Sequence, residues 1–170
     1  YQILARCGYS KEDVAMLPAG YTNAIFQYHK LVCREPAQNR IFVYDTDTGN
    51  RVKEITDVQS DVLLSNRGVV YRDLAENIYL QNWNGETAEL LYEAGAHDQE
   101  SVNYGTYDEE FLYGFVEEET QCTLIKLSWE GGYERSKTFT GVEKAVQLGF
   151  SVNHGVAGYW QNGQIIFEKV

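Results

Sequence analysis

The sequence predicts an all-β fold, a β-propeller-like array of four-stranded antiparallel sheets, because one hairpin recurs along the chain. Residues 41–49, 78–85 and 124–131 each run from an apolar alternating strand into a polar turn that a glycine closes. The three closing glycines lie 36 and then 46 residues apart. Self-similarity at roughly 40 residues, with several short strands in each period, is typical of β-propellers and other repeat arrays.

Alternating apolar and polar residues between turns rich in Gly, Asn and Asp form the period-2 pattern of half-buried strands. These strands group into three complete sets, with two strands before them and three strands after them. The repeat sets cover residues 1–20 (partial), 21–57, 58–95, 98–141 and 144–170 (partial). After residue 20, the expected strands are 23–28, 31–35, 40–45 and 52–56, then 61–65, 69–72, 77–82 and 88–92, then 101–107, 111–116, 121–128 and 133–140, then 145–152, 156–160 and 164–169.

The turn between the first and second strands of each set also repeats. Its members are His29-Lys30, Asn66-Arg67-Gly68, Asp108-Glu109-Glu110 and Asn153-His154-Gly155. Asn and Gly favour tight hairpins because they adopt positive φ values readily. Asn162-Gly163 is the strongest hairpin signal of this kind in the chain.

The strand count predicts about four blades in a single propeller segment over residues 1–170. Two arrangements fit that count. In a small closed ring, residues 13–17 supply the missing strand of the last set. In an open arc of a larger propeller, which we favour, the apolar faces and edges of the end blades lead to self-association.

The charge is acidic and uneven. The net charge is −11, and residues 73–123 contain no Lys or Arg but 13 of the 25 acidic residues. Such a surface repels phosphate backbones, which excludes nucleic acid as a partner. A solvated acidic face is the simpler interpretation, and a cation site or a basic partner is the alternative.

No apolar run approaches the roughly 18 residues of a membrane span. The chain begins with Tyr1 rather than Met, so we expect a processed product or a piece of a longer polypeptide. Cys7, Cys33 and Cys122 are few and widely spaced, which predicts small side chains facing the core. One pair bridges if the compartment is oxidising.

Candidate chemical sites are weak. Asp45 and Asp47, followed by Gly49, have the oxygen spacing of a calcium turn. No third acidic residue or bidentate Glu follows, so an Asp that caps its own turn is the better interpretation. Asp108-Glu109-Glu110 and Glu117-Glu118-Glu119 belong to turns at opposite ends of one set and should not meet.

Nucleophilic catalysis has little support. Ser151 stands in a stretch like a nucleophile elbow, but its second Gly is replaced by Asn153 and a strand follows instead of a helix. His29, His97 and His154 are isolated, and we expect exposed turn residues there. No catalytic, cofactor or metal residue is therefore predicted.

Three tryptophans are the candidate partner-binding aromatics: Trp83, Trp129 and Trp160. Trp83 and Trp129 stand at equivalent positions beside a turn, so packing between sheets is the alternative role. An exposed aromatic cluster at one end of the array would suit a protein or carbohydrate partner.

Residues 40–52 resemble the third-to-fourth strand hairpin of bacterial β-propeller repeats, of the quinoprotein-like, YVTN and TolB-like type. Residues 77–85 and 123–131 resemble the same hairpin in bacterial surface-protein propellers. The resemblance implies a bacterial, extracytoplasmic propeller used for scaffolding or ligand binding. The quinone enzymes of this group need residues that we do not find beyond the hairpin, so no cofactor is expected.

The expected function is a non-catalytic binding or scaffold module that recognises a protein or carbohydrate through a propeller end face. The alternative is part of a carbohydrate-active hydrolase, with paired carboxylates in the central channel. A structural spacer within a larger surface protein is a third interpretation.

Overall fold

The computed structural model describes residues 22–97, 101–118, 121–140, 151–161 and 163–170. It divides into two compact units, residues 1–59 and 60–170, which are described separately below. The interpretation of the whole chain as one propeller segment stays a prediction. The strands and cysteine expected within residues 1–20 lie outside the described residues.

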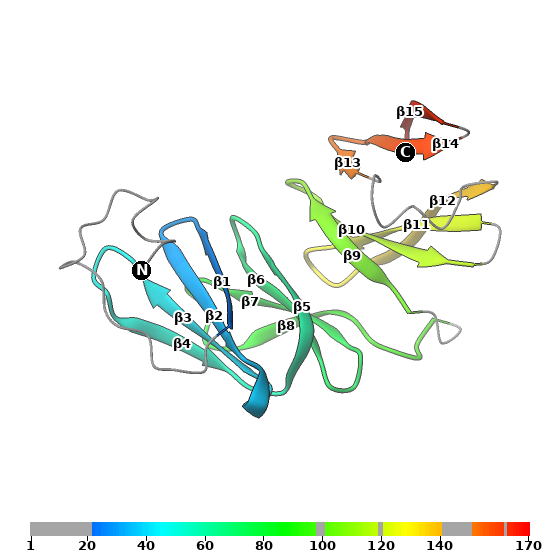
Figure 1. The fold of residues 1–170 in the computed structure, drawn as a ribbon. Coiled ribbons are helices and arrows are strands. Elements are labelled where there is room, and N and C mark those ends of the chain that lie inside the picture. The colour runs from blue at the N-terminus through cyan, green and yellow to red at the C-terminus, as the bar shows by residue number, and fades with distance from the viewer. Residues whose placement is uncertain (1–21, 98–100, 119–120, 141–150, 162) are drawn as a thin grey trace. The chain divides into compact units, whose positions relative to one another are not determined.

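The described strands form four antiparallel sheets, each a meander in which sequence neighbours pair (Figure 1). This arrangement confirms the predicted all-β fold of four-stranded sheets, with a last sheet of three strands. The first sheet contains β1 Thr22–Gln27, β2 Lys30–Glu35, β3 Arg40–Asp45 and β4 Arg51–Ile55. The second contains β5 Val58–Leu64, β6 Gly68–Asp73, β7 Ile78–Asn82 and β8 Ala88–Tyr92. The third contains β9 Asn103–Tyr107, β10 Phe111–Glu117, β11 Gln121–Ser128 and β12 Tyr133–Thr140. The fourth contains β13 Ser151–Asn153, β14 Val156–Gln161 and β15 Gln164–Lys169.

The predicted strands agree closely with these bounds. Five coincide in full: β3, β8, β11, β12 and β15. The largest difference is in the fourth sheet, where a strand was expected over 145–152 and β13 begins at Ser151. Residues 145–150 of that expectation lie outside the described part of the chain.

The first-to-second strand turns reach the same geometry by different means. Tyr28 and His29 (φ 54° and 55°) form a two-residue loop, as do His154 and Gly155 (φ 47° and 69°). Both loops match the twist of the flanking strands through positive φ, as predicted for the second of them. In the second sheet the prediction that Gly68 supplies a positive φ was wrong. Gly68 does not have a positive φ, and glycine is needed there because a neighbouring strand leaves no room for a side chain.

A Cβ at Gly68 would lie 2.2 Å from the backbone oxygen of Gln81 on the neighbouring strand β7. No side chain fits at that distance, so only glycine lets β6 and β7 approach as closely as they do.

In the first unit, the middle strands β2 and β3 carry the core. Val32, Cys33, Ile41, Phe42 and Val43 are each 0–1% exposed. The consecutive burial of these residues means that both faces of the sheet are covered. Cys33 is free and buried, and so is Cys122 in the second unit, which confirms the core-facing interpretation of both.

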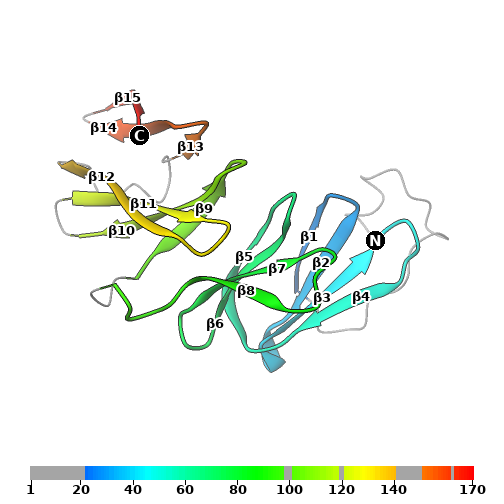
Figure 2. The ribbon, with the colours of Figure 1, turned by 180° about the vertical axis from the view of Figure 1, so that it is seen from behind.

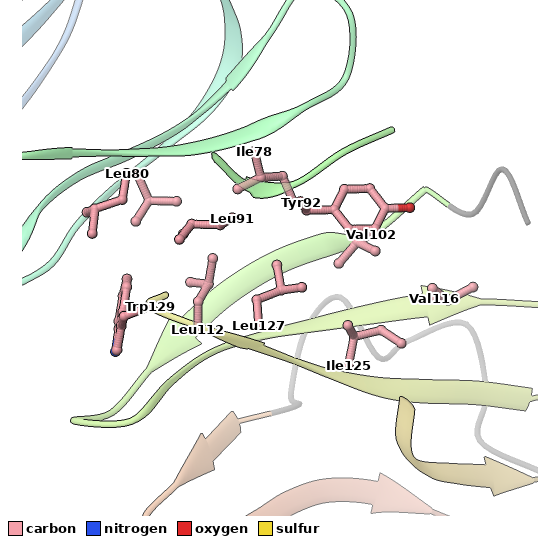
Figure 3. Close-up of a cluster of buried hydrophobic side chains, with 11 residues drawn as sticks. Ile78, Leu80, Leu91, Tyr92, Val102, Leu112, Val116, Ile125, Leu127 and Trp129 are labelled. Atoms are coloured by element: carbon pink, nitrogen blue, oxygen red, sulfur yellow. The ribbon is translucent and has the colours of Figure 1, made fainter. Parts of the chain in front are cut away.

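In the second unit, one core lies between the second and third sheets (Figure 3). Its members are Val70, Ile78, Leu80, Leu91, Tyr92, Val102, Leu112, Val116, Ile125, Leu127 and Trp129. Figure 3 shows Leu112, Leu127 and Trp129 directed from the third sheet toward the side of Leu80 and Leu91. Each buried aliphatic side chain contributes about 1.5–3 kcal/mol, so this interface holds the two sheets together.

A second core joins the third sheet to the fourth. Tyr113, Phe115, Cys122, Leu124, Phe139, Val152, Ala157 and Tyr159 form it. The hydroxyl of Thr106 on β9 also donates a 2.9 Å hydrogen bond to the backbone oxygen of Val152 on β13. Viewed from behind, β9 to β12 remain a continuous meander with β9 and β12 at its edges (Figure 2).

Candidate interaction surface

The turns of the second and third sheets meet at one end of each sheet, here called the hairpin end. It consists of the first-to-second strand turns, residues 65–68 and 108–111, and the third-to-fourth strand turns, residues 82–87 and 128–132. The backbone N–H of Trp83 donates to the oxygen of Arg67 at 3.0 Å, which joins the two turns of the second sheet. The hairpin end is therefore a continuous surface built from hydrogen-bonded turns.

A tryptophan holds the turns together in both sheets. In the second sheet the indole N–H of Trp83 donates to the backbone oxygen of Ser65 at 3.2 Å. In the third sheet the indole N–H of Trp129 donates to the backbone oxygen of Asp108 at 3.3 Å. In both sheets the indole N–H thus donates to the backbone oxygen of the first residue of the neighbouring turn, which explains why tryptophan recurs in this hairpin.

Ser65 and Asp108 also cap their own turns. The Ser65 hydroxyl accepts the N–H groups of Arg67 and Gly68 at 3.2 and 3.1 Å. The Asp108 carboxylate accepts those of Glu110 and Phe111, both at 2.9 Å. Short polar side chains that bond the backbone two and three residues ahead stabilise such turns.

Asp108 receives a third bond from inside the third sheet. Tyr113, 2% exposed, donates its hydroxyl to the Asp108 carboxylate at 2.6 Å. Burial alone would raise the pKa of Asp108, but the bonds from Tyr113 and the two backbone N–H groups outweigh it and lower that pKa. Burial and the same hydrogen bond raise the pKa of Tyr113. Asp108 is thus an ionised structural group rather than a proton donor.

Arg67 connects the second sheet to the third at this end. Its guanidinium donates to the backbone oxygen of Glu109 at 2.9 Å and lies 5.3 Å from the ring centre of Trp129. It also lies 3.9 Å from the carboxylate of Glu130. These contacts fix the relative position of two turns from different sheets.

The three candidate tryptophans differ in what they can offer a partner. Trp129 is 2% exposed and belongs to the core between the sheets, so it is removed from the candidate partner-binding residues. Trp83 is half-buried and keeps part of its surface at the hairpin end. Trp160 lies opposite Ile165 in the β14–β15 register, and its side chain is outside the described residues.

The turns of the hairpin end carry several exposed carboxylates. Glu86, Glu109, Glu110 and Glu130 are exposed there. Glu117 is the last residue of β10 and Glu118 follows it, so both lie at the other end of this seven-residue strand, about 20 Å away at 3.3 Å per residue. The prediction that the two acidic turns stay apart is thereby confirmed for the residues the structure describes.

The proposed calcium turn of the first unit is a capped hairpin instead. The Asp45 carboxylate accepts N–H bonds from Asp47 and Thr48 at 3.1 and 3.0 Å and pairs with Lys30 at 2.9 Å. The bond from Lys30, followed by that from the Thr48 backbone, lowers the pKa of Asp45 to about 2. The preferred interpretation, an Asp that caps its own turn, is confirmed. Within the described ranges, no three His, Cys, Asp or Glu residues cluster as metal ligands would.

The histidine predictions hold for two of three positions. His29 and His154 are exposed in two-residue turns, and His29 lies 3.3 Å from Asp47. His97 is different, because its ring stacks on Tyr133 with centroids 3.8 Å apart and planes 6° apart. The expectation of an exposed turn residue was wrong there, because His97 is half-buried and Tyr133 of the third sheet stacks on its ring.

Sequence reasoning missed the arginines that join the second and third sheets. Besides Arg67, Arg72 is 3% exposed and donates to the backbone oxygen of Val102 at 2.5 Å, while pairing with Glu76 at 3.2 Å. One signal for Arg67 was available in the sequence, because Arg67 aligns with the glutamates of the corresponding turn, Asp108-Glu109-Glu110, in the next repeat set. No comparable signal marked Arg72, which lies in an apolar strand.

Comparison with known proteins supports the architecture only. No protein-family model and no curated protein matches the chain. Among solved structures, the computationally designed Ika8 protein is similar at a TM-score of 0.54 and 11% identity, over 88% of this chain and 46% of that one. Hsv2 of Kluyveromyces marxianus is similar at a TM-score of 0.52 and 13% identity, over 89% of this chain and 48% of that one. A chain of the S. cerevisiae complex of Dbp5 with Nup159 and Gle1 is similar at a TM-score of 0.50 and 8% identity, over 88% of this chain and 47% of that one.

The chain spans slightly less than half the length of these structures. At such low identity the likeness concerns the fold alone. In the described ranges, no helix is long and apolar enough to cross a membrane. The repeated four-stranded antiparallel sheets and the structural neighbours show that the chain has a β-propeller-like fold.

Proposed function

We propose that the chain is a non-catalytic binding or scaffold module that recognises a protein partner through the hairpin end. The observation that carries this proposal is the rigid, acidic surface around Trp83, in which Arg67 and two indole hydrogen bonds fix the turns. A surface fixed before binding loses little conformational entropy when a partner docks.

The charge of the hairpin end selects the partner. The turns of the hairpin end carry four exposed glutamates and the half-buried Trp83, and the only described cation among these turns, Arg67, is already bonded within the surface. A basic protein segment with an apolar or aromatic residue complements this arrangement. The S. cerevisiae neighbour is itself a chain of a multiprotein complex, which is in keeping with a protein partner. A carbohydrate is the alternative ligand.

The hydrolase alternative lacks a specific supporting observation. A glycosidase needs two convergent carboxyl groups, one of them with a raised pKa. The three described carboxyl groups whose pKa is shifted, Asp45, Asp108 and Glu168, all have it lowered. Hydrogen bonds to the ionised form explain all three, and this suits structural carboxylates better than an acid catalyst.

The test is ligand binding with matched charge reversals. A basic-peptide library and a glycan panel are applied to the wild type and to the double variant Glu109→Lys, Glu110→Lys. The control is Glu117→Lys, Glu118→Lys, which makes the same charge change at the other end of β10. Loss of peptide binding in the first variant alone supports the proposal. Equal binding by all three proteins, or hydrolysis of a glycan by the wild type, refutes it.

We further propose, from the resemblance of the repeats, a bacterial extracytoplasmic protein. Self-association through open blade edges is proposed from the open arc that the strand count favours. Fractionation of cells producing the full-length parent protein tests the location. Recovery in the cytoplasm would contradict it.

A further inference from the structure

One asparagine of the hairpin end stands in a chemically reactive sequence. Of the ten asparagines in the chain, two are followed by glycine, Asn84 and Asn162, and Asn162 lies outside the described residues. Asn84 follows Trp83 in the turn between β7 and β8. The backbone nitrogen after an asparagine can attack the side-chain carbonyl carbon of that asparagine, and glycine hinders the attack least because it has no Cβ.

The turn fixes the neighbours of Asn84 but leaves its side chain unbound. The N–H of Trp83 donates to the oxygen of Arg67 at 3.0 Å, and the side-chain amide of Gln81 donates to the oxygen of Gly85 at 2.9 Å. Asn84 itself is exposed, and its side-chain amide makes no hydrogen bond to any residue that the structure describes. Its carbonyl carbon is therefore accessible to water and to the next backbone nitrogen.

The N–H that must be released for this attack makes a long hydrogen bond. Gly85 donates to the oxygen of Asn82 at 3.3 Å, beyond the usual range of about 2.7–3.2 Å. Opening this bond in an exposed turn costs little, so local motion can bring the nitrogen to the Asn84 side chain. A Cβ at position 85 would lie 3.2 Å from the Cβ of Asn82, so the packing of the turn also favours glycine there.

Two other asparagines show what protects a side-chain amide. Asn77 donates to Asp73 at 2.9 Å and accepts the N–H of Ala94 at 2.9 Å, so both ends of its amide are held. Asn82 donates to Glu89 at 2.6 Å. Each is also followed by a large side chain rather than by glycine. Neither asparagine meets the requirements for attack by the next nitrogen.

Asn50 is the nearest counterpart of Asn84. It is exposed in the third-to-fourth strand turn of the first sheet, which corresponds to the turn of Asn84 in the second sheet. Arg51 follows it, and the side chain of that arginine hinders the approach of its backbone nitrogen. The two positions thus differ mainly in the residue that comes next.

We propose that Asn84 is a site of spontaneous deamidation, at which the backbone nitrogen of Gly85 attacks Cγ of Asn84. The new N–C bond closes a five-membered imide, the bond from Cγ to Nδ2 breaks, and the proton of the Gly85 amide leaves with the ammonia. Water then adds to either imide carbonyl and opens the ring to aspartate or isoaspartate. One amide and one water become one carboxylate and one ammonium ion, so no oxidant or reductant is needed.

The product changes the charge of the hairpin end, and this part of the inference rests on the proposed function. An aspartate at position 84 adds a carboxylate beside Trp83, in turns that already carry four exposed glutamates. A basic partner should therefore bind the aspartate form more tightly. Isoaspartate also lengthens the backbone by one methylene between Trp83 and Gly85, whose backbone groups bond Arg67 and Gln81, so that form should lose the fixed turn.

The experiment follows the 170-residue chain at pH 8 by peptide mapping with mass spectrometry. Asn84 is expected to convert over days into aspartate and isoaspartate, which have equal mass and separate by chromatography. Asn50 should convert at least about ten times more slowly, a difference of about 1.4 kcal/mol in activation free energy. Asn84→Gln should abolish the reaction, because the longer side chain closes its ring less readily. Asn50→Gln is the matched control and should leave the conversion of Asn84 unchanged.

An Asn84 that stays intact in the native chain overturns the proposal, whether or not it converts in urea. Equal rates at Asn50 and Asn84 overturn the role of Gly85, and aspartate without isoaspartate overturns the imide route. Asn84→Asp should strengthen binding of the basic peptides that the wild type binds, and unchanged binding overturns the effect on the partner. A chain that deamidates but binds no basic peptide refutes only the proposed function, and an intact chain that binds one refutes only this inference.

Discussion

Removing one buried hydroxyl, in Tyr113→Phe, tests whether the hairpin end depends on its internal hydrogen bonds. The hydroxyl of Tyr113 donates to Asp108, whose carboxylate caps the turn and whose backbone oxygen accepts the indole of Trp129. The variant keeps the ring and its packing but leaves one carboxylate oxygen without its protein donor. A hydrogen bond to a charged group contributes about 1.5–3 kcal/mol. Asp108 is half-buried and keeps two backbone donors, so we expect a loss of about 1.5 kcal/mol at pH 7.

The pH dependence has a definite sign. The pKa of Asp108 is lowered in the folded state, so its contribution to stability is present above the ordinary aspartate pKa of about 3.9 and is lost as pH falls through the folded value. Tyr113→Phe removes the strongest of the bonds that lower this pKa. The difference in unfolding free energy between variant and wild type should therefore be largest at pH 7 and should shrink below about pH 4.

Urea unfolding followed by tryptophan fluorescence is the assay. All three tryptophans lie in residues 60–170, so the signal reports the unit that contains Tyr113. For an m-value of about 2 kcal/mol/M, the midpoint should fall by roughly 0.7 M. Tyr159→Phe is the control, because its hydroxyl donates at 3.1 Å to Glu168, whose side chain is 40% exposed. The reasoning is refuted if both variants lose the same stability at pH 7, or if the difference does not depend on pH.

Two further predictions concern the sheets themselves. Gly68→Ala should lower the free energy of unfolding, measured with urea, by more than about 1 kcal/mol, because the added Cβ would lie 2.2 Å from a β7 backbone oxygen. Gly105→Ala should change the free energy of unfolding little, because no atom lies within 4 Å of its Cβ, and equal effects of the two substitutions would contradict the close approach of β6 and β7. In a Cys7→Ser background, Cys33 and Cys122 should react with a thiol reagent at pH 8 only after unfolding. Burial raises their pKa to about 11 and about 12, and rapid reaction of the native protein would show that they are accessible.

Local sequence patterns determined the strands and turns of this protein. Alternation of period 2 specifies a half-buried strand from neighbouring residues alone, and the bounds of β11 and β12 follow from it. The capping role of Asp45 was predictable for the same reason, because the carboxylate bonds backbone groups only two and three residues ahead.

The tertiary structure decided which of these residues are available to a partner. Trp83 and Trp129 stand at the same place in the repeat and bond equivalent turns, yet Trp129 is buried in the core between two sheets and Trp83 is half-buried. His97 stacks on a ring 36 residues away, and Arg67 bonds a turn 42 residues away. Burial and pairing of this kind depend on which sheet covers a residue, and strand periodicity carries no information about that neighbour.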